Sequence, residues 1–390
     1  MQTKHMKVDA AGNVYESTDL KHDLDGFPGS DSAIRNPSES KGPSRRDVLA
    51  MMGAVGAGVV LAAGESVARP PATAPRIIDV HHHIYPPEYV KGNVARFVAD
   101  APSTTAELFT SWTPHTSLEQ MDQNGVATAI TSMATPALWT GNNEEARRNA
   151  RLCNEYGAQM GRDFPGRFGM WGALPLPDVE GSLKEIEHVL DVLKLDGVGV
   201  LTSYDGGKLL GHKQFAPVMD ELNRRKAVIF VHPTVSCCGH PDPMVAGPPI
   251  ELPVDTTRTI VSLIYSGTIM RCPDLRFIFS HGGGTTLMLT SRLGSNRIAT
   301  PEDKARIIPN GFIGELRKFY YDIASVAVNP AAMAAIFTAL PKDHILFGSD
   351  IPFWKIEPIA TAMNQFSITP SELRGIQREN ALTLLPRWRS

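Results

Sequence analysis

The sequence predicts an α/β protein, a (β/α)8 barrel of the TIM type with long loops after its first and fifth strands. Eight short apolar runs, rich in β-branched residues, follow residue 76. Helical patterns separate these runs, and this alternation indicates parallel strands with helices on their outside. A doubly wound open sheet is the alternative, but no G-x-G-x-x-G motif follows the first run. The barrel is therefore the fold that we expect.

The predicted strands and helices alternate along residues 76–390. Strands are expected at residues 77–80, 127–133, 168–174, 197–202, 227–231, 276–280, 319–324 and 345–348. Helices are expected at residues 142–162, 214–225, 256–271, 285–298, 330–340 and 371–384, and capping-box patterns predict further helix starts at Ser117 and Ser182. The insertions 85–116 and 234–255 carry many prolines and aromatic residues. We expect these long loops to form pocket walls or a lid.

The chain is expected to have four parts. Residues 1–43 are polar, without an apolar period, and predict a disordered leader. Residues 44–68 place Arg45-Arg46 before a weakly apolar run and resemble a twin-arginine export signal. An uncleaved N-terminal anchor or a chance arginine pair is the alternative. We therefore expect a periplasmic or other extracytoplasmic protein, with the twin-arginine export machinery as a partner. Residues 69–75 predict a linker, and residues 76–390 the barrel domain.

Composition excludes several classes of protein. A net charge of -3 over 390 residues gives no indication of a basic surface for nucleic acid or of a polybasic membrane patch. The four cysteines include no C-x-x-C pair, and the adjacent Cys237 and Cys238 are a poor zinc geometry. Free thiols are expected rather than a disulfide scaffold.

Histidine and aspartate residues stand at the carboxyl ends of four predicted strands. His81 and His83 end the first strand and share one face, because side chains alternate along a strand. His232, His281 and Asp350 directly follow the apolar runs of strands five, six and eight. A barrel of this type carries its chemistry at this end of the strands, and imidazole with carboxylate suits a transition metal. The pattern predicts one metal site, although each histidine alone could be a structural strand cap.

These residues also carry a resemblance to a known family. The set H-x-H, His, His and Asp on strands one, five, six and eight resembles that of the amidohydrolase superfamily, over residues 77–385. The segments IDVHHHIYPP, VHP, SHGG and FGSD are similar to its aminocarboxymuconate-semialdehyde decarboxylase branch. Further segments, CNEY at 153–156 and LPLPD at 174–178 among them, resemble the 6-methylsalicylate decarboxylases, to which the γ-resorcylate decarboxylases are related.

The resemblance implies a metal site and a proton donor. The implied ligands are His81, His83, His232 and Asp350, with His281 as general acid or base; a fifth ligand is the alternative for His281. Strand four ends without the lysine that bridges two metals in many hydrolases of the superfamily. We therefore expect one divalent ion, with Zn²⁺ first and Mn²⁺ or Fe²⁺ compatible with the same ligands.

Three further residues could bind substrate, and the resemblance suggests the first of them. Arg292 could reach the site of the neighbouring subunit in a homodimer and pair with a substrate carboxylate, or it could be a solvated surface residue. Arg258 could hold the substrate or pair with Asp255. Trp112 could stack on an aromatic ring or pack its own loop.

The expected activity is nonoxidative decarboxylation of a small aromatic acid of the ortho-hydroxybenzoate type, or of an enol carboxylic acid. His281 or Asp350 would deliver a proton to the ring carbon that bears the carboxylate, and CO2 would then leave. Metal-dependent hydrolysis or hydration of a lactone, amide or unsaturated acid is the second hypothesis, with Asp350 as the base. A secreted binding module with a vestigial site is the third.

Overall fold

The structure is a computed structural model that describes most of the predicted barrel domain. It covers residues 76–389 except 102–103, 137, 235–246 and 296–299, and it gives the backbone of residues 5–8 and 14–17. The predicted export signal and linker lie outside the described residues, as do Cys237 and Cys238. The chain divides into two units, Met1–Ala68 and Arg69–Ser390, and each is described by itself.

The described residues of the first unit form two short strands. β1 (His5–Val8) and β2 (Val14–Ser17) pair antiparallel, with His5 opposite Ser17. We expected no secondary structure within residues 1–43, so these eight residues differ from that expectation. Their valine and tyrosine residues favour strands.

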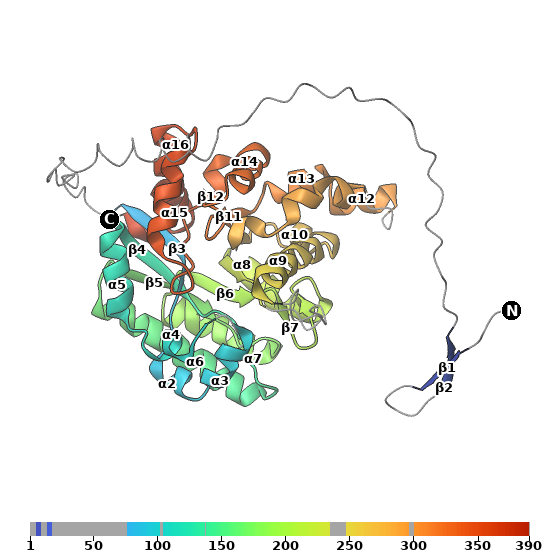
Figure 1. Ribbon diagram of the computed structural model, residues 1–390, viewed down its shortest axis with the longest axis horizontal. Helices are drawn as coiled ribbons and strands as arrows, with labels where there is room; N and C mark the ends of the chain where they lie inside the picture. The colour runs from blue at the N-terminus through green and yellow to red at the C-terminus, as the bar shows by residue number, and fades with distance from the viewer. Residues whose placement is uncertain are drawn as a thin grey trace, which may run out of the picture. The chain divides into compact units, whose positions relative to one another are not determined.

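The second unit contains a barrel of eight parallel strands (Figure 1). The strands are β3 (Ile77–His83), β4 (Val126–Ser132), β5 (Phe168–Ala173), β6 (Gly197–Leu201), β9 (Val228–His232), β10 (Arg276–Phe279), β11 (Tyr320–Asp322) and β12 (Ile345–Leu346). Each pairs in parallel with the next in this order, and each overlaps its predicted range. A separate hairpin of β7 (Ser203–Tyr204) and β8 (Lys208–Leu209) follows β6.

Backbone hydrogen bonds close the barrel between the last segment and the first strand. The Val80 N–H donates to the Phe347 carbonyl at 3.0 Å, and the His83 N–H donates to the Ile351 carbonyl at 2.9 Å. His82 and Ile351 form a parallel bridge at the same seam. The predicted barrel is confirmed, and its seam joins β3, which carries the H-x-H pair, to the segment after β12 that carries Asp350.

Helices surround the strands (Figure 1). They are α2 (Pro87–Lys91), α3 (Val94–Asp100), α4 (Ala106–Thr110), α5 (Pro114–Gln123), α6 (Asn143–Asp163), α7 (Val179–Glu187), α8 (Ala216–Arg224), α9 (Pro248–Tyr265), α10 (Thr268–Arg271), α11 (Thr290–Gly294), α12 (Pro301–Ile307), α13 (Gly311–Leu316), α14 (Pro330–Ala339), α15 (Ile356–Ala362), α16 (Pro370–Arg374) and α17 (Asn380–Leu384). In α6 the buried residues Ala146, Ala150 and Cys153 recur at helical spacing and face the sheet. None of the described helices is both long and apolar enough to cross a membrane.

Several helix starts differ from the sequence prediction. α5 begins at Pro114 behind the N-cap Thr113, so Ser117 lies inside the helix rather than at its start. α7 is likewise capped by Asp178, not by Ser182. In both helices a suitable cap lies upstream, and the pattern that we used occurs one turn later. The two long insertions are partly helical: α2, α3 and α4 lie in the first, and α9 begins within the second.

Apolar side chains fill both the inside of the barrel and the space beneath its helices. Inside, Trp171 stacks on Phe230 with 6.1 Å between ring centroids, and the Trp171 indole donates a hydrogen bond to the Val80 carbonyl. Leu382, Leu385 and the partly buried Trp388 from the C-terminal segment pack onto this inner cluster. The core therefore leaves the carboxyl ends of the strands as the place where polar groups gather.

Candidate active site

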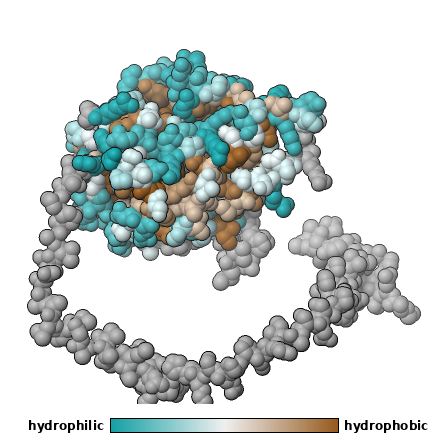
Figure 2. Space-filling model, turned by 90° about the horizontal axis from the view of Figure 1, so that it is seen from above, coloured by the Kyte–Doolittle hydropathy of each residue, from teal (hydrophilic) through white to brown (hydrophobic). Residues whose placement is uncertain are grey.

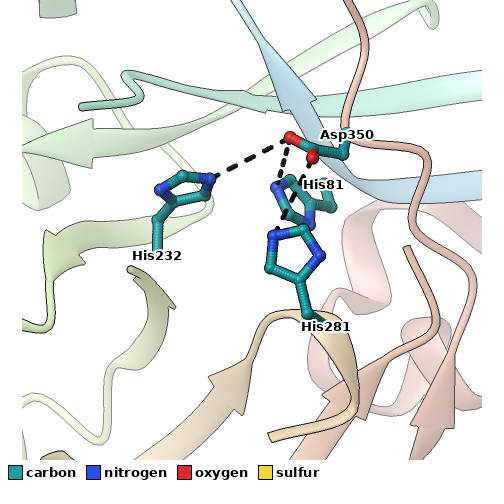
Figure 3. A group of neighbouring side chains, drawn as sticks. All are labelled: His81, His232, His281 and Asp350. Carbon is teal, nitrogen blue, oxygen red and sulfur yellow. Dashed lines mark ion pairs between the residues drawn. The ribbon is translucent and has the colours of Figure 1, made fainter. Parts of the chain in front are cut away.

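Four side chains from four different strand ends meet at one point of the barrel mouth. His81 Nε2 lies 3.2 Å from Asp350 Oδ1, His281 Nε2 lies 3.8 Å from Asp350 Oδ2, and His232 Nε2 lies 4.0 Å from Asp350 Oδ1 (Figure 3). One ligand atom from each residue lies within 4.8 Å of all the others, and all four residues are buried. The predicted convergence of these residues is therefore observed in the structure.

His83 joins this group from the same strand as His81. Its Nε2 lies 3.0 Å from Asp350 Oδ1 and 3.2 Å from His81 Nε2. His82 points the other way, and its ring contacts Asp79 and the Ser117 hydroxyl, as the alternation of a strand requires. We call His81, His83, His232, His281 and Asp350 the histidine–aspartate centre.

The histidines of the centre are oriented through their Nδ1 atoms. His81 Nδ1 lies 2.9 Å from the buried Asp322 carboxylate, and His232 Nδ1 lies 2.7 Å from the Pro233 carbonyl. His281 Nδ1 lies 3.2 Å from the Ala324 carbonyl. In a neutral imidazole, each of these acceptors keeps the single ring proton on Nδ1. The lone pair of Nε2 then points toward the centre. This tautomer is the one that binds a metal through Nε2.

The charges around the centre favour an ionised carboxylate among mostly neutral rings. Burial would raise the pKa of Asp350, but His81 and the other histidines lower it well below its usual range. Burial lowers the pKa of His232 to about 3 and that of His83 to about 4. Burial acts the same way on His81, yet Asp322 and Asp350 outweigh it and raise that pKa to about 10. Asp322 and Asp350 thus favour a positive charge at the position of His81.

The donor atoms fit a divalent metal ion. His232 Nε2 is buried and has no hydrogen-bond partner among the described residues. A buried polar nitrogen without a partner is costly, and a cation that accepts its lone pair removes that cost. Three imidazoles and one carboxylate are a usual ligand set for Zn²⁺ and for related ions. The centre therefore has the composition and orientation of a metal site.

A buried carboxylate below the centre fixes the backbone of Asp350. Asp79 accepts hydrogen bonds from the N–H groups of His81 (3.1 Å) and Ser349 (3.0 Å) and from the Ser349 hydroxyl (2.5 Å). Asp350 then adopts a left-handed conformation, with φ of 65°, and its N–H donates to the His81 carbonyl at 2.7 Å. Such a conformation is uncommon outside glycine and is held by its surroundings. Asp79 thus positions both sides of the seam.

A pocket of about 590 Å³ opens over the centre. Its polar lining includes His232, His281 and Asp350, and its apolar lining includes Phe353 and Trp354. The first turns of α9 supply further apolar wall residues, namely Pro248, Pro249, Leu252 and Pro253. The second long insertion therefore forms a pocket wall, as predicted, although a helix rather than a loop does so.

None of the three predicted substrate-binding residues is among the residues that line this pocket. Arg292 is exposed on α11, and Arg258 lies 3.8 Å from both Glu251 and Asp255, which is the structural pairing that we considered. Trp112 is buried, its indole donates to Ser117 at 3.2 Å, and its ring contacts Tyr85. Trp112 therefore packs its own insertion, because the aromatic residues of that segment cluster together.

Other residues of the site were missed from the sequence. Asp322 ends the seventh strand and orients both His81 and the His281 N–H, at 3.0 Å from the latter. Its signal was an acidic residue inside a run of aromatic and apolar residues. Phe353 and Trp354 lie three and four residues after Asp350 and line the pocket, so their place shortly after a strand end was the available signal. Asp100 also lines the pocket, and no local pattern singles it out.

The chain is similar to known proteins over most of its length. The amidohydrolase family model matches residues 78–387. The decarboxylase macB of Penicillium terrestre is 35% identical over 328 residues, which cover 80% of this chain and 95% of that protein. The 6-methylsalicylic acid decarboxylase of Penicillium expansum is 32% identical over 322 residues, which cover 80% of this chain and 96% of that protein. The predicted resemblance to decarboxylases is confirmed.

A solved structure shows the same fold. The 5-carboxyvanillate decarboxylase of Novosphingobium aromaticivorans, crystallised with manganese and 4-hydroxy-3-methoxy-5-nitrobenzoic acid, superposes with a TM-score of 0.71 at 20% identity. The match covers 80% of this chain and 96% of that one. Together with the family match, which includes every residue of the histidine–aspartate centre, these findings show that the chain belongs to the amidohydrolase family.

Proposed function

We propose that this protein is a metal-dependent, nonoxidative decarboxylase of small aromatic acids of the ortho-hydroxybenzoate type. One observation carries the proposal: the imidazole of His281 and the buried carboxylate of Asp350 line the same pocket, with His281 Nε2 3.8 Å from Asp350 Oδ2. The relatives named above are decarboxylases, one of them of 6-methylsalicylic acid, a compound of this chemical class. A pocket of about 590 Å³ with mostly apolar walls suits a single substituted ring.

The residues of the chain have separate tasks in this reaction. His81, His83, His232 and Asp350 would hold the ion, which when bound supplies positive charge to neighbouring phenolate and carboxylate oxygens. His281 is held by the Ala324 carbonyl and the Ser325 hydroxyl through Nδ1, so its Nε2 faces the pocket. As an imidazolium, with a proton on each ring nitrogen, His281 transfers its Nε2 proton to the ring carbon that bears the carboxylate and returns to the neutral ring with its proton on Nδ1. CO2 then leaves as the bond between this carbon and the carboxylate breaks. Phe353 and Trp354 cover the ring and keep water from the carbon that is protonated.

The direct test is release of CO2 from 6-methylsalicylate, γ-resorcylate and related acids by metal-loaded protein, with the phenol identified as product. Deuterium from D2O should appear at the ring position that lost the carboxylate. Incorporation of oxygen-18 from water into a product, without CO2, would instead indicate the hydrolase. No turnover of any acid in the panel would refute the proposal.

Three finer expectations accompany the activity. We infer Zn²⁺ as the resident ion from the preference of imidazole-rich sites, with Mn²⁺ or Fe²⁺ as alternatives that metal analysis of the purified protein will separate.

The paired arginines at positions 45 and 46 support export through the twin-arginine machinery, which a lysine pair should abolish. Figure 2 shows apolar residues on one face of the molecule, and Met288 and Leu289, which lie shortly before Arg292 in the chain, are exposed apolar residues. Exposed apolar residues near Arg292 support a homodimer that brings Arg292 to the partner's pocket, and sedimentation will test it.

A further inference from the structure

The polar lining of the pocket carries two carboxylates and no lysine or arginine among the described residues. Asp350 belongs to the histidine–aspartate centre, whereas Asp100 comes from the end of α3 in the first long insertion. Arg258 and Arg292 do not line the pocket. The metal site is therefore the place where the described pocket accepts an anionic group, and a second anionic group would face Asp100.

Asp100 is held in place by a chain of hydroxyl groups. The Thr135 hydroxyl donates to Asp100 Oδ2, and the Thr234 hydroxyl lies 3.0 Å from that of Thr135. Because Thr135 has only one proton, Thr234 must donate to Thr135. The Thr234 N–H in turn donates to the Thr202 hydroxyl at 3.1 Å. The chain thus ties Asp100 to the strand ends β4, β6 and β9, which fixes its position in the pocket.

One oxygen of Asp100 remains available to a ligand. Thr135 is the hydrogen-bond partner of Asp100 among the described residues, and it occupies Oδ2. The residue is half-buried, so water partly satisfies the other oxygen until a ligand displaces it. A carboxylate oxygen accepts hydrogen bonds and donates none, so it favours a hydroxyl or amine and disfavours a second carboxylate.

We propose that Asp100 is a specificity-determining residue, which selects aromatic monocarboxylic acids with a second hydroxyl or amine away from the departing carboxylate and rejects dicarboxylic acids. The inference rests on the proposed function for its substrate class. Its physical basis is that a fixed hydrogen-bond acceptor and the histidine–aspartate centre line the same pocket. A ligand that lacks a donor leaves Asp100 desolvated without a partner, and an anion there adds charge repulsion.

The test measures binding rather than turnover. Isothermal titration of metal-loaded protein uses salicylate, the dihydroxybenzoates and the hydroxyisophthalates, which differ by one ring substituent. We expect at least one dihydroxybenzoate to bind about tenfold more tightly than salicylate, and every hydroxyisophthalate to bind more weakly than salicylate. Asp100→Asn, which can donate a hydrogen bond, should raise the affinity for a hydroxyisophthalate relative to salicylate by about tenfold.

Matched variants separate this role from a structural one. Thr135→Val keeps the shape of the side chain but removes the anchor of Asp100. It should weaken both the preference for a dihydroxybenzoate over salicylate and the discrimination against a hydroxyisophthalate, by a smaller factor than Asp100→Asn does. Glu107→Gln removes an exposed carboxylate of the same insertion, outside the pocket, and should leave every ratio unchanged. Ratios that stay the same in Asp100→Asn, or a wild-type protein that binds no acid of the series, would overturn the proposal. Altered ratios without CO2 release from any acid would refute only the decarboxylase.

Discussion

Buried carboxylates occur at both ends of the barrel, and their surroundings differ. At the mouth, Asp350 faces four histidines, and the Nε2 atom of His232 has no partner among the described residues. Beneath β6, Asp196 accepts hydrogen bonds from Arg387 (2.5 Å), Trp388 (2.7 Å) and the Met170 N–H (2.9 Å). Burial of a charged group therefore does not mark a functional site by itself. The two sites differ in that the mouth combines its buried carboxylate with a buried ring nitrogen that has no partner among the described residues.

The largest effect is expected when the mouth carboxylate is neutralised. Asp350→Asn keeps the shape but removes the negative charge of the centre, so metal content should fall and decarboxylation should drop by roughly a thousandfold. Metal analysis and CO2 release measure the two quantities. Asp196→Asn is the matched control at the other end, and it should keep its metal. Full metal occupancy with activity within tenfold of the wild type would contradict the role of Asp350.

Loss of the proton donor should separate chemistry from metal binding. His281→Asn is expected to lower kcat by about a hundredfold or more while the metal content stays unchanged. His344→Asn is the matched control, because its ring stacks on Tyr320 at 4.2 Å beside the other end of the barrel. If His281→Asn loses metal and activity together, His281 is a ligand instead.

At the end of the barrel opposite the mouth, a substitution near Asp196 should lower the stability of the protein and leave kcat unchanged. Trp388→Ala removes ring packing against the inner cluster and leaves Asp196 without one partner, so the free energy of unfolding should fall by about 2 kcal/mol. Urea unfolding measures this change. Trp388→Phe should lose only the hydrogen bond and cost about 1 kcal/mol. A change in kcat of the folded Trp388→Ala protein would show that the two ends are coupled.

The smallest effect concerns a satisfied carboxylate that follows β5 on the mouth side. Asp178 caps α7 and pairs with Arg147 through two hydrogen bonds, of 2.5 and 3.1 Å. Burial would raise its pKa, but Arg147 and the Gly181 N–H lower it. A lowered pKa stabilises the folded state above the ordinary carboxyl value and loses this effect as the pH falls through the lowered value.

Asp178→Asn keeps the cap and removes the charge pair. Its unfolding free energy should therefore lie slightly below that of the wild type at pH 7, and the difference should shrink as the pH falls below about 4. Asp178→Ala loses the cap as well and should cost about 1 kcal/mol more. A difference between wild type and Asp178→Asn that grows toward acid pH would contradict this assignment.

The barrel and the centre were accessible from the sequence for a physical reason. Parallel strands of a barrel are buried on both faces and appear as continuous apolar runs, so a polar residue that follows one is easily seen. His81, His232, His281 and Asp350 all have this context, and the structure brings them together. The alternation of side chains along a strand also explains why His82 points away from His81 and His83 and contacts Ser117 instead.

The individual residues of the pocket walls and of the first long insertion could not be predicted from the sequence in the same way. Asp100 and Trp112 lie on an insertion whose packing depends on contacts far apart in the sequence, such as Thr135 with Asp100 and Ser117 with Trp112. Helix starts were misplaced because Thr113 and Ser117 are both acceptable caps by composition. Asp322 was missed because a single carboxylate in a strand has no periodic signal.

The barrel seam joins the first strand to the segment after the last strand, so the centre forms only after the ribosome has synthesised both segments. The H-x-H pair comes from the first strand and Asp350 from the end of the last, and backbone hydrogen bonds between these segments hold both in place. A ribosome-bound chain therefore has an incomplete centre until residue 350 has emerged. A chain truncated before that point would keep the four histidines but lack both the carboxylate and the edge that closes the barrel, so metal capture would report on closure of the barrel.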